Sequence, residues 1–354
     1  MTPLDSTLEE RLRDWLVDGP EALPDRSVRE IMSAVRALPQ TAPRWWDRLL
    51  SAAPALLAGG AVAAAGAIVA IVGVSMLTRD APSTGGPVAD LIAYASDAGG
   101  TLDIWTVDLA SGATVQLTSG PESDTQPAWS PDGGHIAFSR DGDLWTMAAD
   151  GSDEVPIVVG DGLTDGVDWS PDGSTIAYSL QRGEGGSEIR LIGADGSDDR
   201  LLLAVDAPFG CCPSWSPTGE ELVIAIDLST TGGEIDLYLL DVDGDVPRRL
   251  TALGGDDGSP AWSPSGDLIA YQSDTGGGLA IIAPDGSGRR DLVRVSNKGF
   301  ASDWSPSGDR IAWVDPSGEL WILDVADQGD PTPISGPTSA TPNSLSWRPV
   351  ARGG

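Results

Sequence analysis

The chain has 354 residues, of which 53 are Asp or Glu and 21 are Lys or Arg, so its formal net charge is −32. This charge excludes a nucleic-acid binder, because contacts with phosphate groups need a basic face. The single histidine, His135, and the two cysteines, Cys211 and Cys212, exclude a Cys/His zinc site and a disulfide-rich framework.

Residues 1–50 are predicted to form a small helical segment. Leu4, Leu8 and Leu12 recur at helical spacing, and a second apolar face runs from about Asp25 to Leu38. So short a piece buries little apolar surface by itself. It is therefore either the simple flank of an anchor or a segment that a partner orders.

A single transmembrane helix is predicted over residues 52–78. No charged residue lies between Ala52 and Leu77, and the 23 residues from Ala55 to Leu77 are all small or apolar. At about 1.5 Å per residue they make roughly 34 Å of helix, enough to cross the hydrocarbon core. Arginines gather before this segment, so the N-terminus is expected in the cytoplasm and the rest of the chain outside the cell membrane. The bases nearest the span are Arg36, Arg44, Arg48 and Arg79.

Small residues follow one face of the predicted span, at spacings of four and three. Such a face lets two helices approach closely, which would allow a homodimer through the membrane. An Ala/Gly-rich composition produces a similar row by chance, and both interpretations stay open. The residues are Gly59, Ala63, Gly66, Ala70 and Gly73.

Residues 88–350, which follow a linker at 79–87, contain an internal repeat. Five segments resemble QPAWSPDGGHIAFSR at 126–140, and their tryptophans recur every 40 to 47 residues. This period, with several short strands in each unit, predicts the blades of a β-propeller. In each unit Trp-Ser ends one strand, Pro and Gly form a tight turn, and an Ile-Ala-aromatic run forms the next strand. The motif tryptophans are Trp129, Trp169, Trp215, Trp262 and Trp304, with a sixth at Trp347.

The two ends of the repeat region complement each other. Residues 91–118 contain the second, third and fourth strands of a blade, and the Trp-Ser-Pro strand is missing there. SLSWRP at 344–349 supplies that strand, so Ser344–Trp347 should pair with Leu91–Tyr94 and close a ring of six. The expected fold is all-β: a six-bladed β-propeller closed by its C-terminal strand, preceded by one transmembrane helix and a small helical cytoplasmic segment.

The repeated WSPDG…IAF…DLW…DGS pattern resembles the TolB-type, WD-like propeller repeat over roughly residues 88–350. The resemblance implies a six-bladed propeller of the cell envelope that binds protein or other ligands and has no catalytic centre. TolB itself carries an additional N-terminal domain, and here a membrane anchor stands in its place. The resemblance therefore does not imply the TolB partner.

No catalytic triad is expected. His135 follows the hairpin glycines, where it should face solvent, and a triad needs a histidine within reach of its nucleophile. The acidic residues recur at repeat-equivalent positions such as Asp132 and Asp172, which favours structural roles. A carboxylate-dependent hydrolase or lyase in the propeller channel is the alternative from the enzyme class.

No cofactor is expected, although calcium is possible. Asp241, Asp243 and Asp245 resemble the start of an oxygen-ligand loop, but Ala252 stands where an EF-hand has its glutamate, which favours an ordinary Asp/Gly turn. Cys211 and Cys212 could form a vicinal disulfide outside the cell or remain two small free residues.

The loops between blades differ most from repeat to repeat, so they are the expected ligand-binding face. Acids, amides and aromatics on them would suit a protein, a basic peptide or a carbohydrate better than an anion. The sequence thus predicts a non-catalytic binding or sensing module. Single-span anti-sigma factors share the layout of small helical region, span and outer domain, which makes transmembrane signalling a further alternative. The candidate residues are Asp124, Gln126, Asp165, Phe209, Asp257, Phe300 and Asn343.

Overall fold

A computed structural model describes residues 90–349, apart from 161–162, 183–185, 207–209, 229–232, 245, 253, 276, 295–300, 316, 327–329 and 335–339. At 163–165 and 341–344 it describes the backbone alone. The predicted helical segment, span and linker lie outside the described residues. Within the described part of the chain, no helix is long and apolar enough to cross a membrane.

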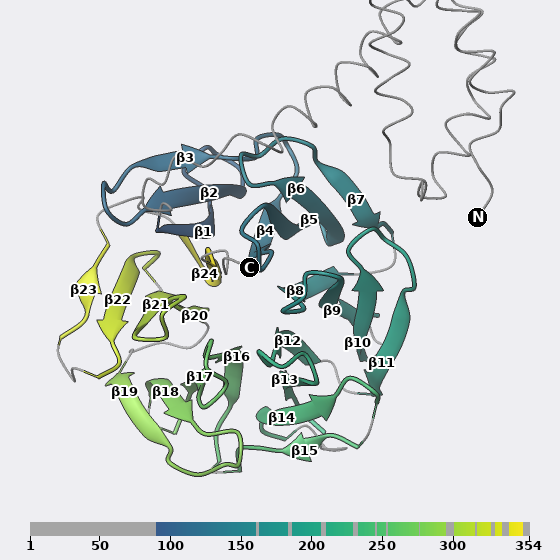
Figure 1. Cartoon of the computed structure of the whole chain (residues 1–354), viewed down its shortest axis with the longest axis vertical. Coiled ribbons are helices and arrows are strands. Elements are labelled where there is room, and N and C mark those ends of the chain that lie inside the picture. The colour runs from purple at the N-terminus through teal and green to yellow at the C-terminus, as the bar shows by residue number, and fades with distance from the viewer. Residues whose placement is uncertain are drawn as a thin grey trace, which may run out of the picture. The chain divides into compact units, whose positions relative to one another are not determined.

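The described residues form six four-stranded antiparallel sheets arranged as blades around one axis (Figure 1). The innermost strands of blades 1 to 6 are β24 (Ala340–Trp347), β4 (Asp124–Trp129), β8 (Leu163–Trp169), β12 (Gly210–Trp215), β16 (Asp257–Trp262) and β20 (Ser302–Trp304). The second strands are β1 (Leu91–Ser96), β5 (His135–Arg140), β9 (Thr175–Gln181), β13 (Glu221–Ile226), β17 (Ile269–Ser273) and β21 (Arg310–Val314).

The third and fourth strands complete each blade outward in the same order. The third strands are β2 (Asp103–Asp108), β6 (Asp143–Ala148), β10 (Ser187–Gly193), β14 (Asp236–Asp241), β18 (Gly278–Ile282) and β22 (Leu320–Asp324). The outermost strands are β3 (Thr114–Gln116), β7 (Val155–Val158), β11 (Arg200–Val205), β15 (Arg248–Arg249), β19 (Arg290–Arg294) and β23 (Thr332–Pro333). The predicted all-β, six-bladed propeller is therefore confirmed.

The ring closes as predicted, because the last strand belongs to the first blade. β24 pairs with β1 in antiparallel register, with Ile92 opposite Trp347 and Tyr94 opposite Leu345. The Trp347 side chain is 3% exposed and packs between blades 6 and 1. The two ends of the described chain therefore hold each other in one sheet.

Antiparallel order divides the ring into two faces. The turns between first and second strands and between third and fourth strands lie on one side, which we call the turn face. The connections between blades and the turns between second and third strands lie on the other side, the loop face. Every Ser-Pro-x-Gly turn is consequently on the turn face, and every candidate residue on a between-blade loop is on the loop face.

The Ser-Pro-x-Gly turn is built by its own side chains. In blade 2, the Ser130 hydroxyl donates to Asp132 (2.6 Å) and accepts from the His135 N–H (2.9 Å). Gly133 closes the turn at a φ of 65°, a left-handed conformation that glycine adopts without strain. The hydrogen bond from Ser130 lowers the pKa of Asp132. The interpretation of this acid as a turn residue is therefore confirmed.

The core consists of apolar layers between consecutive blades. Second-strand residues such as Ile136, Ala137 and Phe138 are fully buried, because a blade packs on each face of their sheet. The motif tryptophans add large apolar area at each junction. Burial between blades rather than within them makes each blade depend on both of its neighbours.

The innermost strands carry a bulge at the third residue before the motif tryptophan. Pairing with the second strand shifts register there in blades 2 to 5. The bulged residues have positive φ, a conformation that re-aims the local backbone. They are Gln126 (55°), Gly166 (85°), Cys212 (60°) and Ser259 (47°).

Gly166 shows how closely neighbouring blades approach at the bulge. A Cβ at this position would lie 2.7 Å from both Cα and N of Cys212, which are backbone atoms of blade 4. We expect Gly166→Ala to lower the free energy of unfolding by about 2–4 kcal/mol, through overpacking and a strained positive φ. Urea unfolding measures this change. Gly258→Ala is the matched control, because its Cβ would meet no atom within 4 Å, and an equal loss in both variants would contradict the close approach.

Candidate functional site

Asp124 is held inside the protein rather than presented to a ligand. Its side chain is 2% exposed, and Arg140 donates to it through Nε (2.7 Å to Oδ1) and Nη2 (2.8 Å to Oδ2). The same guanidinium reaches Glu154 and lies over the rings of Phe138 and Trp145. A ligand would have to break this two-pronged ion pair to reach the carboxylate.

Asp257 occupies the matching position of blade 5 and is also buried, at 2% exposure. Burial raises its pKa, which hydrogen bonds from Ser273 and Thr251 oppose. Ser273 stands where blade 2 has Arg140, so this carboxylate lacks a guanidinium directly opposite it in the sheet. Asp124 and Asp257 are therefore both buried at the starts of their inner strands, next to the second strand of the same blade.

Of the other predicted ligand residues, Gln126 lies on the bulge of β4 and is half-buried. Phe209 and Phe300 lie outside the described residues, as do the side chains of Asp165 and Asn343. Gln126 therefore lies on an innermost strand near the loop face. The binding role of the four remaining residues stays a prediction.

A belt of hydrogen bonds around the axis joins every blade to the next. At all six junctions the acceptor is the residue before the motif tryptophan of the preceding blade, through its side chain or its carbonyl. The bonds are Trp129 N to Ser346 Oγ (3.2 Å), Trp169 Nε1 to Ala128 O (3.1 Å), Trp215 N to Asp168 Oδ2 (2.7 Å), Trp262 N to Ser214 Oγ (3.2 Å), Trp304 Nε1 to Ala261 O (3.0 Å) and Trp347 N to Asp303 Oδ2 (2.7 Å).

The belt repeats every three blades. The residue before the tryptophan is Ser, Ala and Asp in blades 1 to 3 and again Ser, Ala and Asp in blades 4 to 6. Asp168 and Asp303 consequently stand in opposite blades. Burial raises the pKa of Asp168 to about 7, with the Asp303 charge adding to the effect, and burial raises that of Asp303 to about 6. These two acids were not among the predicted site residues.

The two belt carboxyls should make the propeller less stable as pH rises. In the unfolded chain both carboxyl groups ionise near pH 4, so at pH 5 they carry protons in the folded state alone. As the pH rises from 5 to 8 the folded state releases these protons, and the stability that they contribute is lost. We expect the free energy of unfolding to fall by about 2–4 kcal/mol over that range. Asp168→Ser/Asp303→Ser should flatten the profile, because Ser214 and Ser346 already serve the same role. Urea unfolding at each pH measures both, and stability that rises over this range would contradict the assignment.

Cys211 and Cys212 are joined by a disulfide on β12. Cys211 is buried at 3% exposure, and Cys212 is the bulged residue that lies against Gly166. Of the two alternatives for these cysteines, the structure contains the vicinal disulfide. The disulfide joins the bulged residue to its neighbour within β12.

The calcium candidate forms a hydrogen-bonded turn in its described part. The Asp243 N–H donates to Asp241 Oδ1 (2.8 Å), and the Gly244 N–H donates to Asp241 O (3.0 Å). Asp245 lies outside the described residues. Within the described part of the chain, no group of three or more His, Cys, Asp or Glu side chains is placed to hold a metal.

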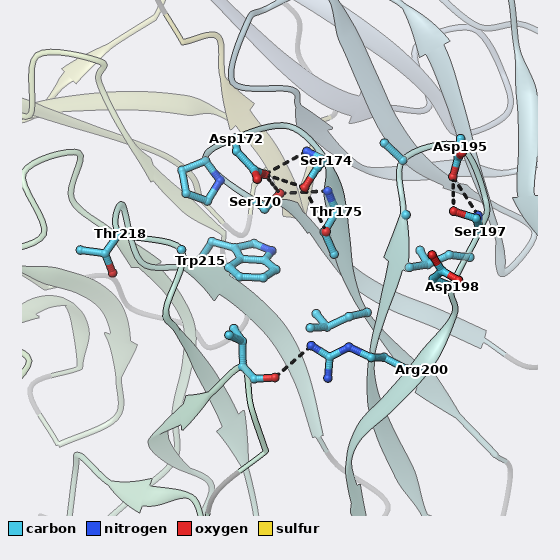
Figure 2. A pocket seen from close by; sticks show the side chains of 17 residues that line it. Ser170, Asp172, Ser174, Thr175, Asp195, Ser197, Asp198, Arg200, Trp215 and Thr218 are labelled. Carbon is cyan, nitrogen blue, oxygen red and sulfur yellow. Dashed lines mark hydrogen bonds between the residues drawn. The ribbon is translucent and has the colours of Figure 1, made fainter. Parts of the chain in front are cut away.

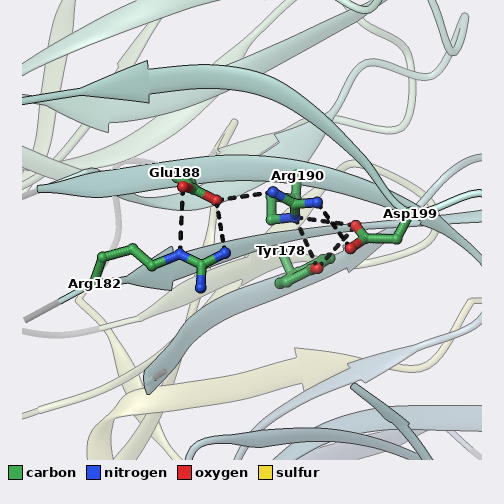
Figure 3. Close-up of polar contacts among 5 residues, drawn as sticks. All are labelled: Tyr178, Arg182, Glu188, Arg190 and Asp199. Carbon is green, nitrogen blue, oxygen red and sulfur yellow. Dashed lines mark hydrogen bonds and ion pairs between the residues drawn. The ribbon is translucent and has the colours of Figure 1, made fainter. Parts of the chain in front are cut away.

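A charged network runs down blade 3 (Figure 3). Arg190 donates to Glu188 (2.9 Å) and to Asp199 (2.8 Å), and Tyr178 also donates to Asp199 (3.0 Å). Arg182 binds Glu188 from the loop-face end (3.3 Å). These groups pair with one another, which is a structural arrangement and not a nucleophile beside a base. His135 is exposed on the turn face.

A pocket of about 670 Å³ opens on the turn face between blades 3 and 4 (Figure 2). Trp215 lies in its middle, between Thr218 on one side and the Ser170–Thr175 hairpin on the other. Its polar wall includes Asp172, Asp195, Asp198 and Arg200. The turn residues that line this pocket look ordinary in the sequence, and only the packing of two blades brings them together with Trp215.

Comparisons with known proteins agree with this architecture. A family model for the TolB beta propeller domain matches residues 71–208 and 143–330. The protein TolB homolog of Chlorobium luteolum is 30% identical over 182 residues, which are 51% of this chain and 31% of that protein. An uncharacterized peptidase of Bacillus subtilis, YuxL, is 26% identical over 209 residues, which are 49% of this chain and 25% of that protein.

The crystal structure of TolB from Acinetobacter baumannii has the same fold. It matches with a TM-score of 0.63 at 18% identity and covers 77% of this chain and 70% of that one. This chain spans between a quarter and a third of the two curated relatives. Because the family model matches well over half of its residues, the chain belongs to the TolB β-propeller family.

Proposed function

We propose that this member of the TolB β-propeller family is a membrane-anchored, extracytoplasmic module that binds a protein partner and has no catalytic centre. The observation that carries the proposal is the closed ring itself. Its six blades are joined at every junction around the axis. Such a rigid scaffold presents a broad face of loops, which suits recognition of a large partner.

The charges of the described residues support binding over catalysis. Asp124 is committed to Arg140, and Glu188 and Asp199 of blade 3 are committed to Arg182 and Arg190. A carboxylate pair for hydrolysis must instead face a substrate across an open site. The acidic predicted ligand residues therefore act in the scaffold where the structure describes their side chains.

Membership of the family supports a place in the cell envelope, since the relatives include proteins named TolB. The anchor is proposed at residues 52–78, with the N-terminal segment in the cytoplasm, on the strength of the uncharged stretch and the arginines before it. Outside the membrane, a ring that is strongly acidic would attract a basic partner faster at low salt.

The loop face is the proposed binding face, because the bulges re-aim the inner strands at that end and the loops differ there. Photo-crosslinking in intact cells tests it. A photoreactive amino acid in place of Glu122 or Ala252, both exposed on between-blade loops, should yield one discrete heavier species. The same residue in place of Val155, 49% exposed on an outermost strand, is the matched control.

The face is wrong if Val155 gives the adduct and both loop positions fail. The binding proposal itself is wrong if no position on either face or on the outer strands yields an adduct with another protein. Washing the cells at high salt before irradiation should weaken the loop-face adduct, because screening reduces attraction between unlike charges.

A further inference from the structure

The pocket over Trp215 lies where two other blade junctions hold an arginine. Each motif tryptophan packs against the preceding blade at the turn face, so repeat-equivalent residues can be compared junction by junction. Two positions of the preceding blade reach over the indole. One is the residue directly after that blade's own tryptophan, and the other is the first residue of its second strand.

At the junction of blades 1 and 2, the first position is Arg348. Its guanidinium lies 5.1 Å from the ring of Trp129. Nε and Nη2 also donate to the carbonyl of Gly133, the glycine of the turn in blade 2 (3.1 and 2.8 Å). This arginine therefore fills the space over the indole and binds the turn beside it.

At the junction of blades 6 and 1, the second position is Arg310. Its guanidinium lies 5.0 Å from the ring of Trp347 and donates to Asp90 (3.0 Å). A cation over an indole is stabilised by the negative face of the ring. Two of the six junctions thus cover the tryptophan with an arginine of this chain.

At the junction of blades 3 and 4, the equivalent residues are Ser170 and Thr175. Both line the pocket, together with Trp215 and with Gly219, the counterpart of Gly133. Neither Trp129 nor Trp215 gives its Nε1 hydrogen to another described residue. The two indoles therefore match in this respect and differ in what covers them.

The wall of the pocket is acidic. Asp172, Asp195 and Asp198 face one base, Arg200, whose Nη2 already donates to the carbonyl of Val242 (2.9 Å). Hydrogen bonds from Ser170 and Ser197 lower the pKa values of Asp172 and Asp195, so both are ionised at neutral pH. The space, the aromatic floor and the surplus negative charge together match a guanidinium.

We propose that the pocket between blades 3 and 4 binds an arginine side chain of a peptide or protein, stacked on Trp215 and paired with Asp198 or Asp195. The bound group takes the place that Arg348 and Arg310 take at their own junctions. This site is on the turn face and stands whether or not the loop face binds the partner proposed above.

Fluorine NMR of the full-length chain labelled with 5-fluorotryptophan tests the proposal. The Trp215 signal is assigned by its loss in Trp215→Phe. N-acetyl-arginine N-methylamide should shift that signal and saturate in the millimolar range, as expected for a single side chain. The citrulline analogue, which has nearly the same shape and no charge, should leave the signal unmoved at equal concentration.

Two variants place an arginine of the chain itself in the pocket. Ser170→Arg copies the junction of Arg348, and Thr175→Arg copies that of Arg310, so one remains if the other fails to fold. Each variant should shift the Trp215 signal in the absence of N-acetyl-arginine N-methylamide. In each variant, adding this probe should cause no further shift. Ser307→Arg, which adds the same charge at the exposed turn of blade 6, should respond as the unmodified chain does. No saturable shift, an equal response to citrulline, or a response that survives in the folded variants would overturn the proposal.

Discussion

Deleting residues 340–354 should unfold the propeller rather than merely loosen one blade. The deletion removes β24, so β1 loses its inner partner and its backbone N–H and C=O groups along one edge lose their hydrogen bonds. It also removes Trp347, and truncation of a buried tryptophan alone costs about 3–5 kcal/mol. Asp303 then has no Trp347 N–H to bind. We expect a loss above about 5 kcal/mol, comparable with the whole stability of many domains.

Circular dichroism and urea unfolding measure this loss in the full-length background. Removal of residues 351–354 alone is the control, because it leaves β24 intact and should change little. Trp347→Ala separates the contribution of the side chain from that of the strand and should lie between the two. A protein without residues 340–354 that unfolds at the same urea concentration as the intact chain would contradict closure of the ring.

Arg140→Met should lower the free energy of unfolding by about 3–5 kcal/mol, because it leaves the Asp124 carboxylate buried without its partner. The pair is nearly closed to solvent, with side-chain exposures of 15% for Arg140 and 2% for Asp124. The variant also loses the cation over Phe138 and Trp145.

Arg182→Met is the matched control for Arg140→Met. It removes the same guanidinium from an ion pair in which Arg182 is 39% exposed and Glu188 is 22% exposed. An ion pair so open to water contributes about 1 kcal/mol or less. Urea unfolding of both variants at pH 7 gives the comparison. Equal losses would show that burial does not decide the importance of the Asp124–Arg140 pair.

The fold could be predicted because the same sequence pattern for a blade recurs several times along the chain. Each unit carries a Trp-Ser-Pro strand, a turn that needs Pro and Gly, and an apolar strand, so an error in one unit is corrected by the others. The closing strand could be predicted for the same reason, since SLSWRP matches a strand that residues 91–118 lack. Local residue preferences and the long-range pairing agree in this fold.

The candidate site was harder to predict, because the sequence does not say which loop acids are buried. Asp124 and Asp257 begin inner strands, and whether a carboxylate there meets solvent depends on Arg140 or Ser273 in the neighbouring strand. A signal did exist for the belt acids. The residue before each motif tryptophan repeats as Ser, Ala, Asp every three blades, and this pattern separates Asp168 and Asp303 from the turn acids.

The pocket over Trp215 could not be predicted from the sequence, because recognising it requires the packing of neighbouring blades. Ser170 and Thr175 are ordinary turn residues in the sequence, and only their equivalence to Arg348 and Arg310 at other junctions gives them meaning. That equivalence joins residues of adjacent blades, which the repeat alignment alone does not place together. At this junction both positions carry small side chains, Ser170 and Thr175, and both line the pocket.

Labelling of the two amines of the chain tests the central claim, a propeller displayed outside the membrane, most directly. The sequence contains one lysine, Lys298, in the propeller region, and the other amine is the N-terminus of Met1. These two groups are predicted to lie on opposite sides of the membrane. A membrane-impermeant amine reagent added to intact cells should label Lys298 and spare Met1, and lysis should expose both. Label on Met1 with Lys298 protected in intact cells would contradict the account.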